Sequence, residues 1–430
     1  MSERRIGLWG AVATLVGYVI GASIFVLPAE LLPSAGAGVL VAYLLAAVPA
    51  VFTCVCGAVI ANVFPVSGAS YVSVRETLSP RVAFHTAWAI TCAASLGAAL
   101  VAWGLADYAA WFWPTVPPMA IALTSVVVFV LLNLTPVTVT VAAQGAMVVL
   151  FALVIAAFAV GGLLRGNWAL ATPLVPSSGA VLGGAVAAYF SYAGLQVLID
   201  IGGEIRDPGR TIPRALALSF ATVLLLYLGF VLAVVVLSGN GTDAQASALV
   251  GRIAERTFGA GFARAIVVSA LLAAATSING IFFTQARDVH ALARDGRLPR
   301  VLAGTTNGIP RAAVLALGVV ALAATAVGAS VRSYAVLTAM CMMAVQAVLG
   351  LSALRAPVAA PAAWATSQFR PGPGTLRFFG WGLVVVSTLF FVLGASQSAL
   401  NAVLFVAVLV SGELVYRLQA RHAGATPPLP

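Results

Sequence analysis

Two stretches of this chain interrupt segments that are otherwise continuously apolar. Residues 17–28 read GYVIGASIFVLP, and residues 188–208 read AYFSYAGLQVLIDIGGEIRDP. Small residues gather near the middle of the first segment and again in the second, five apolar segments later. Segments interrupted by Gly or Pro at corresponding places in two halves of a chain are typical of inverted-repeat membrane proteins, whose site lies at the breaks. We therefore expect both segments to be broken helices.

The composition excludes a soluble globular protein. Hydrophobic residues make up 62% of the 430 residues, charged residues 8%, and the mean hydropathy is +1.07, whereas soluble domains carry about 25% charged residues. The apolar runs are long and continuous, which excludes a transmembrane β-barrel with its alternating segments. At about 20 apolar residues per span, the sequence predicts twelve spans: 7–29, 36–62, 83–112, 116–133, 138–164, 181–203, 215–238, 263–286, 312–330, 333–354, 377–396 and 398–416.

These spans predict an all-α polytopic membrane protein with one transmembrane domain over residues 1–430. Repeat one covers about 7–164, repeat two about 181–354, and two extra helices lie at about 377–416. Twelve spans place both termini on one side. Seventeen of the 22 basic residues fall on that side and five on the other, and the positive-inside rule then predicts that both termini are cytoplasmic, in the cell membrane.

The broken helices predict a binding site made of backbone. A break in mid-membrane exposes amides, which bind anions, and carbonyls, which bind cations. A zwitterionic amino acid carries both charges and needs no charged side chain for its backbone. We expect its carboxylate at the amides near Gly21, Ala22 and Ser23, and its ammonium at the carbonyls of Val19, Ile20, Phe190 and Ala193. In the alternative interpretation, Gly21 only packs against a neighbouring helix.

The ionisable residues narrow the function further. Asp200 and Glu204 lie near the cytoplasmic end of the sixth span, where we expect them to pair with the arginines that follow; in the alternative interpretation they carry a proton. No carboxylate is placed at the midplane, which argues against polyamines and dibasic amino acids. The net charge of +10 comes from arginines standing singly between apolar runs, so nucleic acid is not an expected partner. No grouping of His, Cys and carboxylates predicts a catalytic residue, a metal centre or a cofactor, so the chain is not expected to be an enzyme.

Four motifs, in order along the first eight spans, resemble those of one membrane protein family. They are GYVIGASIF (17–25), FPVSGASYVSVRETLSP (64–80), FSYAGLQVLIDIGGEIRDPGRTIPRAL (190–216) and ALARDGRLP (291–299). Together they resemble the amino acid permease branch of the amino acid–polyamine–organocation superfamily. The ninth to twelfth spans match that family only in hydropathy and span count.

The resemblance implies a five-plus-five inverted-repeat fold with alternating access. It assigns the substrate carboxylate to the amides of Ala22 and Ser23, and the ammonium to carbonyls of Val19, Ile20 and Ala193, with Gly194 beside them. It also implies three gate positions: Phe190 as an aromatic lid, Ile281 where some relatives have a second aromatic gate, and Gln196 where some have an acidic gating residue.

The coupling ion is a separate question. Some family members use a lysine on the fifth span for proton coupling, but this chain has no lysine, and the corresponding stretch reads MVVLFAL (147–153). Sodium-coupled relatives of the fold use an A-x-x-T-S pattern, which here implies a candidate sodium site at Gly17, Ile20, Ala273, Thr276 and Ser277. In the alternative, Thr276 and Ser277 bond their own helix backbone.

These observations predict a secondary transporter of small neutral or apolar L-amino acids, driven by a sodium or proton gradient or working by exchange. One alternative is import of an amine or another amino-acid-derived compound. Another is a transport-inactive sensor or partner subunit. Some family members join a partner through an external cysteine between the third and fourth spans, but residues 113–118 read WPTVPP. We therefore expect the amino acid and the lipid bilayer as partners, and no obligatory protein partner.

Overall fold

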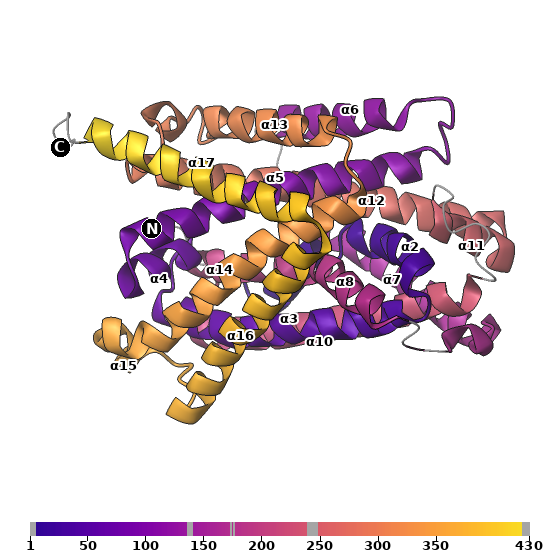
Figure 1. Ribbon diagram of the computed structural model, residues 1–430, viewed down its shortest axis with the longest axis horizontal. Coiled ribbons are helices and arrows are strands. Elements are labelled where there is room, and N and C mark those ends of the chain that lie inside the picture. Colours follow the sequence, from indigo (N-terminus) through magenta and orange to yellow (C-terminus); the bar gives the residue numbers. More distant parts are fainter. Residues whose placement is uncertain (1–5, 136–140, 173, 175–176, 239–247, 424–430) are drawn as a thin grey trace.

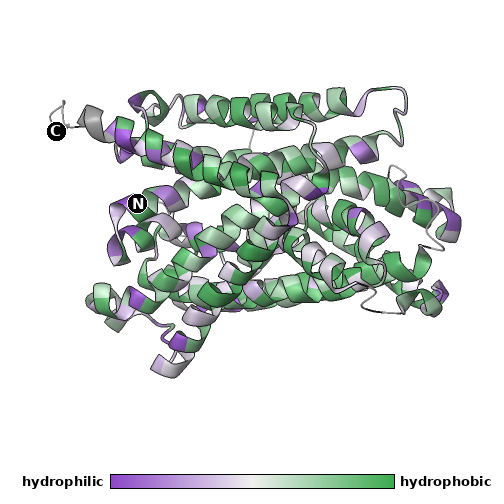
Figure 2. Cartoon of the chain, viewed as in Figure 1, coloured by the Kyte–Doolittle hydropathy of each residue, from purple (hydrophilic) through white to green (hydrophobic). Residues whose placement is uncertain are grey.

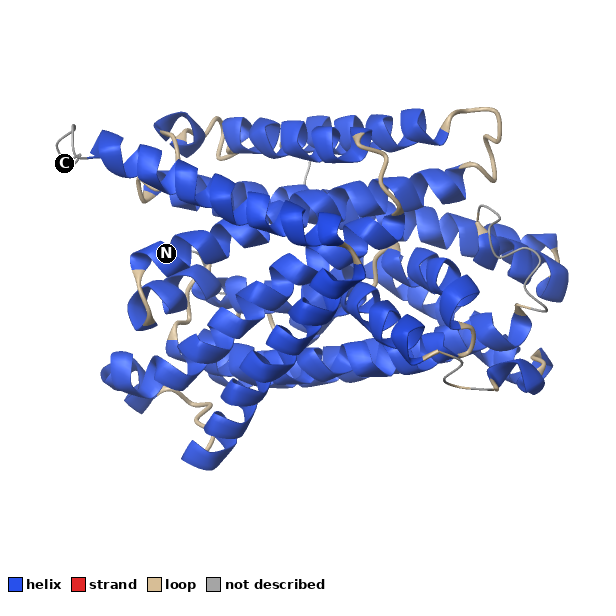
Figure 3. Cartoon of the chain, viewed as in Figure 1, coloured by secondary structure: helices blue, strands red, loops and turns tan. Residues whose placement is uncertain are grey.

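All regular structure in the described part of the chain is helical (Figure 3). The computed structural model describes every residue except 1–5, 136–140, 173, 175–176, 239–247 and 424–430. The predicted start of the fifth span, at 138–140, therefore lies outside the described residues.

The long helices follow the predicted order of spans (Figure 1). The first predicted span consists of α1 (Leu8–Val19) and α2 (Ser23–Ala35), and the sixth of α8 (Ser178–Tyr189), the 3₁₀ helix η2 (Phe190–Gln196) and α9 (Val197–Asp200). The others are α3 (Gly38–Val63), α5 (Pro80–Ala109), α6 (Pro118–Asn133), α7 (Val141–Arg165), α10 (Pro208–Leu237), α12 (Ala260–Arg294), α13 (Arg311–Ala326), α14 (Val331–Ala359), α16 (Pro373–Gln397) and α17 (Ala399–Ala423). Shorter elements connect them: α4 (Ala69–Thr77), η1 (Trp168–Ala171), η3 (Gly202–Glu204), α11 (Leu249–Phe258), η4 (Arg300–Ala303) and α15 (Pro361–Thr366).

Ten of these helical segments, among the residues described, are long and apolar enough to cross a membrane. Two more, α6 and α13, are apolar but have only 16 residues each, fewer than the about 20 that a straight span needs. The count of twelve spans therefore stays a prediction. Apolar residues fill the middle of the bundle and hydrophilic ones gather toward its two ends (Figure 2), as a bilayer requires.

Local signals in the sequence set several helix ends. Ser79 precedes Pro80 at the start of α5, and its hydroxyl accepts a hydrogen bond from the amide of Val82 at 3.3 Å. Serine at the N-cap with proline at the first helical position is a strong helix start. Gly36 has a φ of 51° and separates α2 from α3, a backbone conformation that glycine adopts without steric cost.

The two interrupted segments lie inside the bundle. The first half of the first span, α1, contacts α10, η2, α7 and α12, while α3 packs along both α8 and α10. α5 lies against α12 and α14. The last two long helices are peripheral, since α16 packs mainly on α14 and α17 mainly on α5 and α16. This arrangement surrounds the breaks with protein on several sides.

Several arginine-bearing segments meet at one end of the bundle. Ile6, at the start of the described chain, forms a bridge with the segment after the sixth span. Arg75 of α4 lies 3.6 Å from Asp295, just after α12, and Arg81 of α5 lies 2.6 Å from Glu413 near the end of α17. These contacts gather at one end the loops that the charge pattern assigns to the cytoplasm.

Candidate functional site

The first break leaves free backbone donors at a helix start. Ile20 departs from helical geometry with a ψ of 76°. The amides of Phe25 and Val26 both bond the carbonyl of Ala22, at 3.0 and 3.1 Å, so the hydrogen-bond ladder of α2 begins there. The first amides of a helix have no intrahelical acceptor, and the helix dipole favours an anion beside them. The amides at 22–24 therefore form the kind of site that binds a carboxylate.

The second interruption is a change of helix type. Residues Phe190–Gln196 form a 3₁₀ helix between two α-helical pieces, where the sequence led us to expect an open break. A 3₁₀ helix keeps backbone hydrogen bonds but is tighter and less stable than an α-helix. Gly194 permits close contact with α1, since a Cβ there would lie 2.9 Å from the Tyr18 ring and 3.3 Å from the Val19 Cα. The two interrupted segments are therefore in direct contact.

Tyr227 of α10 joins the two interrupted segments. Its hydroxyl lies 2.7 Å from the Val19 carbonyl oxygen and 3.1 Å from that of Ser191, and it shares its proton between them. The amide of Gly21 also donates to the Val19 carbonyl, at 2.9 Å. The Val19 oxygen thus already accepts two hydrogen bonds, and its role in binding an ammonium stays a prediction. Sequence reasoning missed Tyr227, because nothing in its local sequence relates it to either break.

A cavity of about 110 Å³ lies between the interrupted segments, α5, α12 and α14. One water needs about 10–15 Å³ of such space, so the cavity can hold a small solute. Most of the predicted substrate residues line it: Val19, Gly21, Ala22, Ser23, Phe190, Ala193 and Gly194. Ile20 is fully buried and does not line it.

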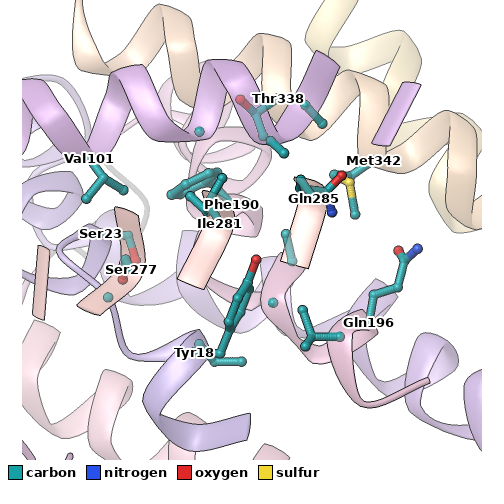
Figure 4. Close-up of a pocket in the computed structure, with 18 of the residues that line it drawn as sticks. Tyr18, Ser23, Val101, Phe190, Gln196, Ser277, Ile281, Gln285, Thr338 and Met342 are labelled. Carbon is teal, nitrogen blue, oxygen red and sulfur yellow. The ribbon is translucent and has the colours of Figure 1, made fainter. Parts of the chain in front are cut away.

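Sequence reasoning missed a second set of lining residues. They are Tyr18, Ile90, Ala93, Ala94, Gly97, Val101, Val197, Asp200, Gln285, Thr338 and Met342. Tyr18 and Val197 directly neighbour predicted residues, and this adjacency was the available signal. The others come from α5, α9, α12 and α14; Asp200 lies within the motif at 190–216 but was expected to pair with arginines, and no motif marks the rest. Figure 4 shows Ser23 and Ser277 at one end of the cavity and Gln196 and Gln285 at the other.

The middle of the cavity is apolar. The Phe190 ring lies against Gly97 of α5, where an added Cβ would be 3.1 Å from a ring carbon and 4.0 Å from the Ile281 side chain. Figure 4 shows Phe190 and Ile281 together between the two ends. All three predicted gate residues therefore line the cavity, and two of them meet over one glycine.

The opposite end of the cavity is polar. Gln196 accepts a hydrogen bond from Gln346 of α14 at 3.0 Å and donates to the Ser70 hydroxyl at 3.4 Å. The amide of Ser70 in turn donates to the Asp200 carboxylate at 2.9 Å. This network connects α14, η2, α4 and α9.

Asp200 differs from its expected environment. Among the residues with described positions, no arginine lies within the 4.0 Å ion-pair distance of its carboxylate. It instead binds the first turn of α4 and lines the cavity. The expectation of arginine pairing is therefore not met for Asp200. Asp200 nevertheless lines the cavity, and the exclusion of cationic substrates stays a prediction.

The candidate sodium residues are only partly brought together. Thr276 donates to the carbonyl of Ala273 at 2.9 Å, the bond to its own helix that the alternative describes. Ser277 is 7% exposed, and its hydroxyl has no hydrogen-bond partner among the described atoms. Gly21 faces it so closely that a Cβ there would overlap the Ser277 oxygen. Of the five predicted residues only Ser277 lines the cavity, so the sodium site stays a prediction.

Comparison with known proteins gives the family. The amino acid permease family model matches residues 10–411. Uncharacterized transporter Rv1999c of Mycobacterium tuberculosis is 32% identical over 335 residues, covering 75% of this chain and 74% of the relative. The lysine-specific permease LysP of Escherichia coli is 27% identical over 71% of this chain and 68% of its own. The branched-chain amino acid permease BcaP of Bacillus subtilis is 26% identical over 69% and 68%. The chain therefore belongs to the amino acid permease family, a group of multi-pass membrane transporters within the amino acid–polyamine–organocation superfamily.

Proposed function

We propose that this protein is a secondary transporter that carries small neutral or apolar L-amino acids across the cytoplasmic membrane by alternating access. One observation carries the proposal: the residues whose free amides begin α2 line a cavity beside a second interrupted helix. This pairing offers backbone donors for a carboxylate and backbone acceptors for an ammonium, so the common part of every amino acid has a place.

The walls support a neutral side chain. Ile90, Val101, Phe190, Ile281 and Met342 present hydrocarbon or thioether surface to the cavity. An apolar side chain gains by leaving water for such a surface. Ser23 at the first break and the alanines of α5 keep the remaining space small. The substrate is bound with its charged end at the break and its side chain against these walls.

A cationic amino acid is the second candidate, and Asp200 is the observation that favours it. Its carboxylate reaches the polar end of the cavity, where the ammonium of a long side chain would find a charge partner. The named relatives include both a lysine-specific and a branched-chain permease. A competition assay separates the two candidates. If leucine but not lysine inhibits uptake of a labelled neutral amino acid, the result supports the neutral substrate.

The topology and coupling complete the proposal. The twelve predicted spans, with local thinning of the bilayer at the short helices α6 and α13, place both termini in the cytoplasm. Spans one to five and six to ten form the inverted repeats. Transport is driven by sodium, with Ser277 among the ligands, by protons or by exchange. Import of an amine, and a transport-inactive sensor role, remain the alternatives.

Counterflow in proteoliposomes tests the proposal. Vesicles preloaded with unlabelled amino acids should take up labelled leucine or alanine, and Ser23→Trp should abolish this uptake because an indole fills the first break. Ser23 is 3% exposed and lines the cavity. Gly261→Ala, at a glycine with nothing within 4 Å of an added Cβ, is the matched control. Full uptake by Ser23→Trp would place the site elsewhere, and inhibition by decarboxylated amines would favour the amine alternative.

A further inference from the structure

Two carboxylates lie near the polar end of the cavity: Asp200 lines it, and Asp288 accepts a hydrogen bond from Gln285, which lines it. Asp200 ends α9, and Asp288 lies on α12; the two are electrostatic neighbours, and each also neighbours Tyr18 of α1. Among the described residues, neither has an arginine within the 4.0 Å ion-pair distance. Two like charges in a low-dielectric interior repel each other strongly, and binding a single proton removes one of them.

Gln285 shows that this place lacks a hydrogen-bond donor. Its side-chain amide nitrogen donates to the Asp288 carboxylate at 3.2 Å. Its carbonyl oxygen has no partner among the described atoms, although the residue is 7% exposed and lines the cavity (Figure 4). A buried acceptor without a donor is costly. A proton held on the neighbouring Asp288 carboxylate, as a carboxyl O–H, would therefore bring a hydrogen-bond donor to a place that lacks one.

The two carboxylates are not equivalent. Asp200 accepts from the amide of Ser70 at 2.9 Å, in the first turn of α4, where the helix dipole and free amides favour a negative charge. Among the described residues, only the side-chain amide of Gln285 donates to the Asp288 carboxylate. The charge is therefore better held on Asp200 and the proton on Asp288.

The other charged residues near Asp200 and Asp288 have contacts of their own. Arg287, beside Asp288 on α12, lies over the Phe283 ring at 3.4 Å and has both Asp288 and Glu204 as electrostatic neighbours. On α4, Arg75 forms ion pairs with Glu76 and Asp295, at 3.0 and 3.6 Å. Tyr18 of α1 lines the same cavity as Asp200 and is close enough to both carboxylates for their charges to act on its hydroxyl.

We propose that Asp288, paired with Asp200, is the proton-binding site that couples amino acid transport to a proton gradient. The inference rests on the transport function proposed above. A proton binds the Asp288 carboxylate from one side of the membrane and leaves to the other, and no bond other than this O–H forms or breaks. Asp200 transmits this change in protonation to the lid. The hydrogen bonds of Ser70 and Gln196 connect Asp200 to η2, the segment that carries Phe190.

Proteoliposomes containing a pH-sensitive dye test the proposal. With wild-type protein, adding leucine or alanine outside should acidify the lumen, and an inward proton gradient should drive accumulation. Asp288→Asn should lose both, with accumulation falling to the level seen without a gradient. Counterflow between preloaded vesicles and medium should persist, since Asp288 does not line the cavity. Asp288→Glu should restore proton movement, and Glu76→Gln, a carboxylate in contact with solvent, should behave as wild type.

Each outcome decides the question. If the wild-type protein shows counterflow but no proton movement, this inference is overturned and the transport function stands. If the wild-type protein shows no counterflow, the transport function itself is refuted. Unchanged proton movement in Asp288→Asn also overturns the inference. Should that variant fail to fold, Asp200→Asn is the second variant to test. Unimpaired proton-driven accumulation in Asp200→Asn would contradict the inference. If either asparagine variant keeps proton movement but lysine no longer competes with the labelled amino acid for uptake, the inference is overturned. The pair would then be a recognition site for a cationic side chain.

Discussion

Gly21→Ala tests the contact between the first break and α12. A Cβ at this position would overlap the Ser277 hydroxyl, and the next atom, the Ser277 Cβ, would be 3.2 Å away. Overpacking costs about 1–3 kcal/mol, and rotation of the terminal Ser277 hydroxyl keeps the cost here near the lower end, about 1 kcal/mol or roughly 5-fold in an equilibrium. Because the remaining strain separates the break from α12 in the conformation described here, we expect the rate of counterflow to fall roughly 5-fold.

A second substitution, at Ser277, should rescue the defect of Gly21→Ala. Ser277→Ala removes the overlapping oxygen and leaves only the 3.2 Å contact, which a shift of a few tenths of an ångström relieves. The double variant should therefore recover most of the counterflow that Gly21→Ala loses, with a coupling energy of about 1 kcal/mol. Gly261→Ala serves as the control for a methyl added without a neighbour. Wild-type counterflow in Gly21→Ala, or strictly additive losses in the double variant, would refute the reasoning.

Three further changes test other contacts of the site. Tyr227→Phe removes the hydroxyl that joins the interrupted segments; since such bonds in membrane proteins average about 0.6 kcal/mol, thermal unfolding in detergent should show a modest loss of stability, and an increased melting temperature would contradict this. Gly97→Val adds bulk 3.1 Å from the Phe190 ring, so the KM for uptake should rise while protein yield is unchanged; an unaltered KM would show that the lid does not contact substrate. Thr276→Ala combined with Ser277→Ala should abolish any sodium stimulation of uptake, and a retained sodium response would remove the ion site from consideration.

The positions of the breaks were predictable because their cause is local. Gly21 is small where two helices touch, and the structure shows this contact with Ser277. The form of the second interruption was not predictable in the same way. A 3₁₀ helix and an unwound loop suit the same composition, and here the contacts of η2 with α1 and with Tyr227 accompany the tighter form.

Asp288 shows why the polar end was missed. The apolar window of the eighth span ends at 286 because Arg287 follows, and the sequence therefore places Asp288 outside the membrane-spanning segment. In the structure α12 continues for 35 residues to Arg294. Arg287 lies along the helix, over the Phe283 ring and bonded to its carbonyl at 2.7 Å, as long cationic side chains do when they cover apolar surface. Asp288 thus stays on a continuous helix beside the cavity.

Asp200 was misjudged for a different reason. Arginines follow it in the sequence from Arg206 onward, but its carboxylate binds the amide of Ser70, 130 residues away. Such a contact depends on how α4 docks against α9, and no periodicity or motif in a single sequence reports it. The backbone part of the site was therefore accessible from sequence, whereas the polar network behind it required the fold.

Uptake of labelled neutral amino acids into proteoliposomes tests the central claim most directly. Three conditions are compared: an inward proton gradient, an inward sodium gradient, and no gradient with amino acid preloaded inside. The account predicts uptake into preloaded vesicles and accumulation under the proton gradient, both abolished by Ser23→Trp. Absence of uptake under all three conditions, with protein that is folded and inserted, would contradict it.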